Sequence, residues 1–575
     1  MTPALSFKTV PALLVLTLCY FTVTAWNLGL QHIAGPDEPR YAVAARNMLH
    51  GGDLIVPMFN QHPHLEKPVL FHWLLVASGY VSEKLGVPLD TAGFRFVPLL
   101  MGWLTVVALY LLSSKLLNPR GALIAALILI TSFQFHNVSR ELVIDMTLTC
   151  FLLWSWLFFH HAAERIEAHQ SAFSQLLGFY LCLGFACMSK GPFLVAIFSV
   201  VPLLLYLGWT QRMTLLLRAG IWWGLPLSLA MGLSWFVALH YRGIDSSSFF
   251  TTENLARFFG KKDHIHKLPF FFYIISMPEI FAPWFLLFPF AAWWTCNTLR
   301  AKKSALSVPA KLAACALGAG FVVMGLSGSK RHLYLMPLFP WVSLWLAWYI
   351  ERNFLNRSEK PAGRFPELLL KASGVLLLLS AVAVAFWLPK SGGTTLESAI
   401  CATTGLAGLL ALFAAASALN KADYSGALFR ILALALLLAF MLEAVVRPIH
   451  ERAMNLSEFY AEVNVRAGGK ELVIMGTNSN EAAWYVTNAR GEIDEIGPRD
   501  LKPRFFDSTG TNLLLAVSYF DNRPSLKQSL LVLSPQFSRN NMSFLLAAPD
   551  PLHPPDASVF KVNAPNKKLS FFNDL

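Results

Sequence analysis

The sequence predicts a polytopic α-helical membrane protein that ends in a small α/β domain. The 575-residue chain is 55% hydrophobic and only 14% charged, with a mean hydropathy of +0.50, whereas soluble domains carry roughly 25% charged residues. Nearly charge-free windows also recur along the chain. With their flanks they approach the ~20 residues that a helix needs to cross a membrane. The clearest windows are Leu13–Leu30, Leu99–Leu112, Ala122–Phe133, Phe193–Leu207 and Val375–Leu388.

The hydropathy pattern divides the chain into two domains. About thirteen apolar spans are expected within residues 1–446, and the first is a retained helix because no cleavage pattern of small residues follows it. Residues 447–575 have a different composition, with strand-like apolar runs separated by polar and Pro/Gly stretches. These runs are Glu471–Met475, Leu513–Val517 and Leu530–Leu533. This pattern is typical of a small α/β domain.

The distribution of basic residues predicts the orientation in the membrane. The most basic loops fall on one side if the spans alternate, and that side is the cytoplasm because cytoplasmic loops are enriched in Lys and Arg. These loops are Lys115–Arg120, Gln211–Arg218, Arg300–Lys311, Arg352–Arg364 and Lys421–Arg430. Membrane topology thus accounts for most of the net charge of +12, and a nucleic-acid partner is not expected. The segments 34–91 and 241–267 and the C-terminal domain then lie outside, which in a bacterial inner membrane means the periplasm.

Two amphipathic stretches lie within the first outer segment. Glu38–Leu49 and Pro68–Lys84 are separated by a Pro/His/Gly-rich stretch. Their periodicity predicts two helices that lie on the membrane surface.

Several cations lie on the outer side, where the topology rule does not expect them. Arg40 and Lys67 fall in the first outer segment, Arg257 falls in the second, and Lys330–Arg331 stands at the end of a span. Cations at a membrane surface suit a lipid phosphate, since Arg can bind it with two hydrogen bonds and Lys acts as a point charge. Solvated surface charge is the alternative, and it is the favoured interpretation for the neighbouring Lys261–Lys262.

Carboxylates accompany these cations. Asp37 and Glu38 follow the first span directly, and such a carboxylate could orient a hydroxyl group or take its proton. Asp37 could equally be a helix N-cap with Pro39 in the first turn. Glu141 and Asp145 are four residues apart, a spacing that predicts one helical face, although Arg140 could simply neutralise Glu141.

A divalent metal is a weaker hypothesis. The pairs His62/His64 and His264/His266 alternate in outer loops, but such pairs are poor metal signatures without further ligands. Glu66 and His264 are the candidate ligands. The seven cysteines fall in or beside apolar segments, which favours buried apolar roles over a disulfide framework. No nucleotide-binding loop or nucleophile elbow is present.

Several short motifs occur along the chain in the same order as in a known protein family. They are Gly35–Tyr41 (GPDEPRY), Gly52–Asp53, Leu65–Pro68 (LEKP), Ser189–Pro192 (SKGP), Glu253–Phe258 (ENLARF) with His264 and Pro269–Tyr273, and Ser329–Pro337 (SKRHLYLMP). Residues 1 to about 350 thereby resemble bacterial GT-C glycosyltransferases of the aminoarabinose transferase type, which are related to protein O-mannosyltransferases. The rest of the chain matches that family in its plan of spans followed by a periplasmic domain.

The resemblance implies transfer of a sugar from a polyprenyl-phosphate carrier to an acceptor at the outer face of the inner membrane. In the family, the sugar is 4-amino-4-deoxy-L-arabinose and the acceptor is lipid A, which lowers the negative charge of the envelope and confers resistance to cationic peptides. By matching position, Asp37 is the principal catalytic carboxylate, with Glu38 and Asp145 beside it. The substrate-binding residues are Arg40, Tyr41, Glu66, Lys67, Glu141, Arg257, Lys330, Arg331 and Tyr334.

The chain departs from the family at Pro39, where Thr is usual, and at Lys330–His332, which is more basic and polar. Another sugar, or a protein or polysaccharide acceptor, is therefore the first alternative. A lipid transporter or flippase is the second, but it predicts inverted repeats with helices broken at mid-membrane, and the sequence has no obvious repeat.

Overall fold

The computed structural model describes most of the chain up to residue 466 and the strands beyond it. The described residues are 9–35, 37–260, 268–300, 307–355, 375, 379, 382, 394–420, 424–454, 457–466, 471–475, 483–487, 490–495, 513–517, 530–532, 537–539 and 542–549. The chain forms two compact units. The first comprises Met1–Leu28, Leu65–Leu74 and Arg95–Arg447, and the second comprises Gly29–His64, Leu75–Phe94 and Pro448–Leu575.

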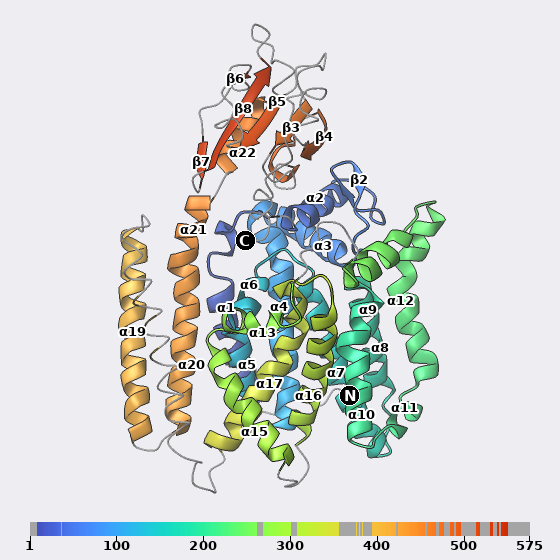
Figure 1. The fold of residues 1–575 in the computed structure, drawn as a ribbon, viewed down its shortest axis with the longest axis vertical. Coiled ribbons are helices and arrows are strands. Elements are labelled where there is room, and N and C mark those ends of the chain that lie inside the picture. Colours follow the sequence, from blue (N-terminus) through green and yellow to red (C-terminus); the bar gives the residue numbers. More distant parts are fainter. Residues whose placement is uncertain are drawn as a thin grey trace. The chain divides into compact units, whose positions relative to one another are not determined.

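The first unit is a bundle of helices, many of them roughly parallel (Figure 1). Its longer helices are α1 (Thr9–Thr24), α4 (Phe94–Leu116), α5 (Pro119–Ile130), α7 (Asp145–Glu167), α8 (Phe173–Lys190), α10 (Val201–Trp209), α12 (Ile221–Tyr241), α15 (Phe288–Arg300), α16 (Val308–Leu326), α17 (Phe339–Ile350), α19 (Thr395–Asn420) and α20 (Tyr424–Met441). The short elements that matter below are α6 (Phe133–Val138), α9 (Pro192–Val195), η4 (Phe249–Ala256), α13 (Phe272–Ile275), η6 (His332–Leu338) and η9 (Leu442–Val446). Helices α7 and α8 pack on each other, as do α19 and α20 (Figure 1).

Long apolar helices confirm the predicted fold class. Within the described residues, eight helical segments are long and apolar enough to cross a membrane. Four of the predicted windows overlap α1, α4, α5 and the segment Pro192–Trp209. The fifth, Val375–Leu388, lies largely outside the described residues. The total of thirteen spans therefore stays a prediction.

A buried charge network joins helices that are far apart in the sequence. The Glu443 carboxylate, in η9, lies 3.1 Å from Arg140 Nη2, 2.7 Å from His136 Nε2 and 2.6 Å from Arg447 Nε. Glu443 and Arg140 are both 0% exposed. Arg140 also donates to the backbone carbonyl of Trp26 beyond α1. The positive charge that could have neutralised Glu141 is thus paired with Glu443.

The second unit contains the first of the two predicted surface helices, most of the second one and the C-terminal domain. Helix α2 spans Glu38–Leu49, as predicted, and α3 (Leu70–Lys84) begins two residues after the predicted Pro68. Helices α21 (Arg447–Met454) and α22 (Ser457–Arg466) lead into the sheet. The side chains of His32 and Glu451 form an ion pair, which ties the segment after the first span to α21.

In the described part of the C-terminal domain, six strands form one sheet in the order β4-β3-β5-β8-β6, with β7 paired to β8. The strands are β3 (Glu471–Met475), β4 (Arg490–Glu495), β5 (Leu513–Val517), β6 (Leu530–Val532), β7 (Phe537–Arg539) and β8 (Met542–Pro549). Strand β3 pairs in parallel with β4 and β5, whereas β8 is antiparallel to its partners. Helices preceding a mixed sheet confirm the predicted α/β class, and the three predicted strands correspond to β3, β5 and β6. The predicted boundary at residue 447 stays a prediction.

Candidate active site

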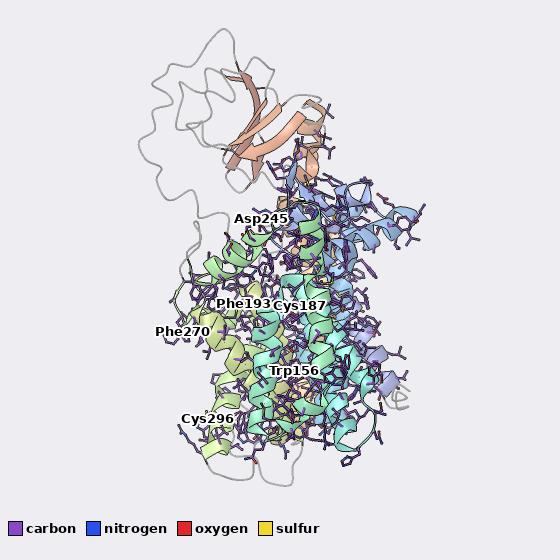
Figure 2. The ribbon with its side chains drawn as sticks, turned by 90° about the vertical axis from the view of Figure 1, so that its right-hand side faces the viewer. Trp156, Cys187, Phe193, Asp245, Phe270 and Cys296 are labelled. Atoms are coloured by element: carbon purple, nitrogen blue, oxygen red, sulfur yellow. The ribbon has the colours of Figure 1, made fainter. Side chains whose placement is uncertain are left out.

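Several of the polar residues that the motifs singled out lie together within the first unit. Figure 2 places Asp245, Phe193 and Cys187 toward one end of the bundle and Trp156 and Cys296 toward the other. Helix α8 ends three residues after Cys187, at Lys190. The ring of Phe193, in α9, meets the ring of Phe258 edge to face at 5.3 Å between centroids. That contact holds the segment after η4, and with it Arg257, against the end of α8.

The turn between α8 and α9 requires a glycine. Gly191 has a φ of +92°, and a Cβ atom there would stand 2.8 Å from Cζ of Phe249 in η4. Both the left-handed backbone and the close approach exclude larger residues. The Ser189–Pro192 motif therefore fixes the position of Lys190 relative to η4.

Lys67 and Arg257 share one carboxylate. Glu253 Oε2 lies 3.2 Å from Arg257 Nη1 and 3.9 Å from Lys67 Nζ, although Lys67 lies in the loop before α3 and the other two residues belong to the segment of η4. The Lys67 and Glu253 side chains are 14% and 9% exposed. The structure thus brings together two of the outer cations that were predicted to suit a lipid phosphate.

Burial is the main reason that the pKa of Lys67 falls to about 8, and the positive charge of Arg257 lowers it further. Glu66 and Glu253 act in the opposite direction. The Lys67 ammonium also donates to the backbone carbonyl of Glu66 at 2.9 Å. Such a pair of neighbouring cations is a site where an anion gains charge-assisted hydrogen bonds.

Asp145 and Lys190 form a second, adjacent ion pair. Asp145 is the first residue of α7 and Lys190 is the last residue of α8, and their side chains are each 6% exposed. The Lys190 ammonium lies 4.8 Å from the centroid of the Tyr334 ring, in η6. Lys190 is also an electrostatic neighbour of Lys67. Asp145 and Tyr334 were both predicted site residues, and Lys190 connects them.

The remaining predicted residues of the first unit lie around these pairs. Arg331, Tyr334 and Glu66 are electrostatic neighbours of Arg257. Lys330 Nζ donates to the backbone carbonyls of Ser327, at 2.5 Å, and Leu268, at 3.1 Å. These hydrogen bonds stabilise the turn that follows α16, so Lys330 has a structural role. Its role in substrate binding stays a prediction.

The position of Glu141 differs from the predicted one. Helix α6 ends at Val138 and α7 begins at Asp145, so Glu141 lies in the non-helical link between them. The prediction that Glu141 and Asp145 share a helical face is therefore wrong. Four-residue spacing predicts a common face only where the helix is continuous. A role for Glu141 in substrate binding is not tested by this.

Asp37, Glu38, Arg40 and Tyr41 all belong to the second unit. Asp37 occupies the N-cap position of α2, and its side chain makes no capping hydrogen bond to the first turn. The alternative prediction of a helix N-cap with Pro39 in the first turn is thus confirmed for the position of Asp37, without a capping hydrogen bond from its side chain. Glu38 is 8% exposed, and its Oε2 accepts a hydrogen bond from the Ala34 amide at 3.3 Å. The Tyr41 ring meets His64 edge to face at 5.8 Å.

The structure adds two residues that sequence reasoning did not assign to the site, Lys190 and Glu253. The signal for Lys190 was present, because the Ser189–Pro192 motif was recognised as part of the family resemblance, but its lysine was given no role. Glu253 stands four residues before Arg257, a spacing at which side chains meet on a helix. Neither pattern alone identifies the residue across the bundle that completes each pair.

The chain is similar in sequence to several known proteins. A family model described as dolichyl-phosphate-mannose-protein mannosyltransferase matches residues 66–237. An undecaprenyl phosphate-alpha-4-amino-4-deoxy-L-arabinose arabinosyl transferase of Shewanella sediminis is 26% identical over 361 residues, which is 60% of this chain and 61% of that protein. The protein of the same name from Pseudomonas aeruginosa (strain LESB58) is 29% identical, over 65% of each chain. The chain thus covers less than two-thirds of the length of each relative.

Solved structures establish the fold. The crystal structure of ArnT from Cupriavidus metallidurans bound to undecaprenyl phosphate matches with a TM-score of 0.69 and 17% identity, over 98% of this chain and 100% of that chain. The apo structure of the same protein matches with a TM-score of 0.68.

The fold is therefore the GT-C type fold of the solved ArnT structure, with the membrane helices followed by an α/β domain. The chain is similar in sequence to proteins named undecaprenyl phosphate-alpha-4-amino-4-deoxy-L-arabinose arabinosyl transferase. This confirms the family resemblance that the sequence motifs predicted.

Proposed function

We propose that this protein is a glycosyltransferase that moves 4-amino-4-deoxy-L-arabinose from an undecaprenyl-phosphate carrier to lipid A. The observation that carries the proposal is the pair of cations Lys67 and Arg257, held 3.9 Å and 3.2 Å from one carboxylate oxygen, beside the buried pair of Asp145 and Lys190. A phosphate group suits this pair of cations. The chain is also similar to proteins named for this reaction.

In this reaction the protein mainly has to neutralise the charge on the donor phosphate and to align the acceptor with the donor sugar. The bond between the anomeric carbon and the phosphate oxygen breaks, and the oxygen keeps the electron pair, while an acceptor oxygen bonds to the same carbon from the opposite side. Lys67 and Arg257 would stabilise the charge that develops on the departing phosphate. Alignment of the acceptor behind the carbon supplies the rest of the acceleration. Single displacement predicts inversion at the anomeric carbon.

Asp37 has two roles that depend on the acceptor. It would accept the proton of a hydroxyl acceptor. An ionised phosphate acceptor needs no base. Asp37 would then orient a group of the substrate or stabilise positive charge that develops on the sugar ring. Tyr41, Glu66 and Asp145 would shape the site.

A divalent metal stays a prediction. Glu66 is described, whereas His264 lies outside the described residues. Within the part of the chain that the structure describes, no group of three His, Cys, Asp or Glu residues is arranged to hold a metal ion. The test is transfer activity after chelation: a loss that Mg²⁺ or Mn²⁺ restores supports the metal, and unchanged activity removes it.

We further propose that the protein lies in the bacterial inner membrane with the site and the C-terminal domain in the periplasm. Asp245 and Cys296 lie toward opposite ends of the bundle (Figure 2), and the basic loop after Cys296 is assigned to the cytoplasm. A membrane-impermeant maleimide added to intact spheroplasts should label an Asp245→Cys variant in a Cys296→Ser background, and should not label Cys296 in the wild type. The reverse pattern contradicts the orientation.

The deciding experiment is transfer of labelled sugar from undecaprenyl-phosphate donors to lipid A by the purified protein. An Asp37→Asn variant should lose most activity while binding undecaprenyl phosphate normally, and Glu164→Gln, a surface change, serves as the control. Equal activity of wild type and Asp37→Asn removes Asp37 from the mechanism. Transfer only to protein or polysaccharide, or of another sugar, supports the first alternative. Lipid movement without any transfer supports a flippase.

A further inference from the structure

Glu253 is in an unusual place for a site that should attract anions. Its carboxylate oxygen occupies the space between Arg257 Nη1 and Lys67 Nζ, at 3.2 Å and 3.9 Å. An oxygen of a bound phosphate would have to make the same contacts. The chain therefore supplies its own anion at the position where the carrier phosphate is proposed to bind.

The local backbone supports a functional role for this arrangement. Residues 249–256 form a π-helical segment, η4, and such segments are rare and occur frequently at functional sites. Glu253 and Arg257 lie four residues apart in one segment, so this ion pair is local and does not require another part of the fold. Lys67 is different, because it comes from the loop before α3 and meets Glu253 only through the fold.

The proposed reaction changes the charge of the ligand that this cluster holds. The donor is a phosphodiester with one negative charge. Transfer of the sugar leaves a phosphomonoester, whose second pKa of roughly 6 gives it about −1.5 to −2 charges at neutral pH. Two cations acting alone would hold the product more tightly than the donor. Turnover would then be limited by release of the spent carrier.

We propose that Glu253 is a specificity-determining residue that reduces the preference of the cation pair for the doubly charged undecaprenyl phosphate product over the singly charged donor. This inference rests on the proposed function. The carboxylate repels each negative charge on the ligand, so it weakens binding of the product more than binding of the donor. It also compensates Lys67 and Arg257 when no ligand is bound, so an empty site does not contain two uncompensated cations.

The test is binding of undecaprenyl phosphate to the full-length protein in detergent, at pH 6.5, for the wild type and for Glu253→Gln. Glutamine keeps the shape and removes the charge, and pH 6.5 keeps Lys67 protonated because its pKa is about 8. The variant should bind the product about tenfold more tightly, which corresponds to about 1.4 kcal/mol. Binding of the sugar-loaded donor should tighten by a smaller factor. Glu83→Gln, in α3, is the matched control because its carboxylate pairs with His50 instead.

Kinetics provide a second readout that a merely structural role would not produce. In Glu253→Gln, added undecaprenyl phosphate should inhibit transfer at about one-tenth of the wild-type concentration. Unchanged or weaker product binding by the folded variant overturns the inference. If Glu253→Gln does not fold, Glu253→Asp retracts the carboxylate by one methylene and should tighten product binding by a smaller factor, and an unchanged affinity overturns the inference equally. Wild-type protein that binds no undecaprenyl phosphate overturns the proposed function as well.

Discussion

The ionisation of Lys67 should control binding of the carrier within an accessible pH range. Burial and the neighbouring Arg257 lower its pKa to about 8, so the ammonium is present below pH 8 and is lost as the pH rises through that value. An anionic ligand binds the protonated form. The affinity for undecaprenyl phosphate should therefore fall above pH 8, by up to about tenfold per pH unit. Measuring the affinity for undecaprenyl phosphate at several pH values between pH 6.5 and 9.5 tests this prediction.

Lys67→Arg is the informative comparison, because guanidinium stays charged throughout this range. The variant should retain binding at pH 9, where the wild type has lost most of its affinity. An affinity that is flat in the wild type from pH 7 to 9.5 would contradict a phosphate role for the Lys67 ammonium.

At the residue scale, the sequence predicted the chemistry of single side chains better than their partners. Lys67, Arg257 and Asp145 were identified because charged residues beside apolar spans are conspicuous. Their partners Glu253 and Lys190 were not assigned, since each ion pair includes a contact across the bundle that only the fold creates. Glu141 shows the opposite error, because its spacing from Asp145 assumed a helix that begins only at Asp145.

At the scale of elements, the pair of Asp145 and Lys190 joins the start of α7 to the end of α8. Both side chains are 6% exposed, so removing one partner leaves a buried charge without compensation. Lys190→Met should therefore destabilise the protein by about 3–5 kcal/mol, and Asp145→Asn combined with Lys190→Met should recover much of that loss. Thermal unfolding in detergent measures both. Equal unfolding temperatures for the single and double variants would show that the two residues do not compensate each other.

The network around Glu443 should matter more for stability than any surface ion pair. Glu443 contacts Arg140, His136 and Arg447, and it is 0% exposed. Glu443→Gln should cost several kcal/mol because Arg140 remains buried without its counter-charge. Glu164→Gln is the matched control, since Glu164 is 47% exposed and lies 3.6 Å from Lys115, a geometry worth about 0–1 kcal/mol. Similar unfolding temperatures for the two variants would contradict this ranking.

Elements with a clear period were predictable, and elements defined by tertiary packing were not. The bounds of α2 follow from amphipathic spacing and from Pro39 in the first turn. The π-helical segment η4 has no such signature. Its place is set by Phe258 against Phe193 and by the close approach of Phe249 to Gly191, which are contacts between segments about sixty residues apart.

At the scale of the whole molecule, the predicted site residues divide between the two compact units. The cations Lys67 and Arg257 belong to the unit formed by the membrane helices, whereas Asp37 belongs to the unit that contains the C-terminal domain. Composition alone predicted a membrane part followed by a soluble part. It could not predict that residues 29–64, which follow the first span, group with residues beyond 447.

Arg46 links α2, which follows Asp37, to the C-terminal domain within that second unit. Its Nη1 donates to the backbone carbonyl of Trp484 at 2.8 Å, and its guanidinium lies 4.4 Å from the centroid of the Trp484 ring. Burial lowers the pKa of Arg46 to about 10. The Trp484 ring therefore covers a cation on the helix that presents the proposed catalytic carboxylate.

Trp484→Ala should consequently impair transfer without impairing carrier binding. Loss of the ring contact, worth about 1 kcal/mol or more in a desolvated setting, loosens α2 and should lower kcat about fivefold to tenfold. The affinity for undecaprenyl phosphate should be unchanged, because Lys67 and Arg257 belong to the other unit. Val465→Ala, at a position in α22 that is 78% exposed, should change neither quantity. If Trp484→Ala weakens carrier binding as much as it slows transfer, the C-terminal domain acts on the whole site and not through α2 alone.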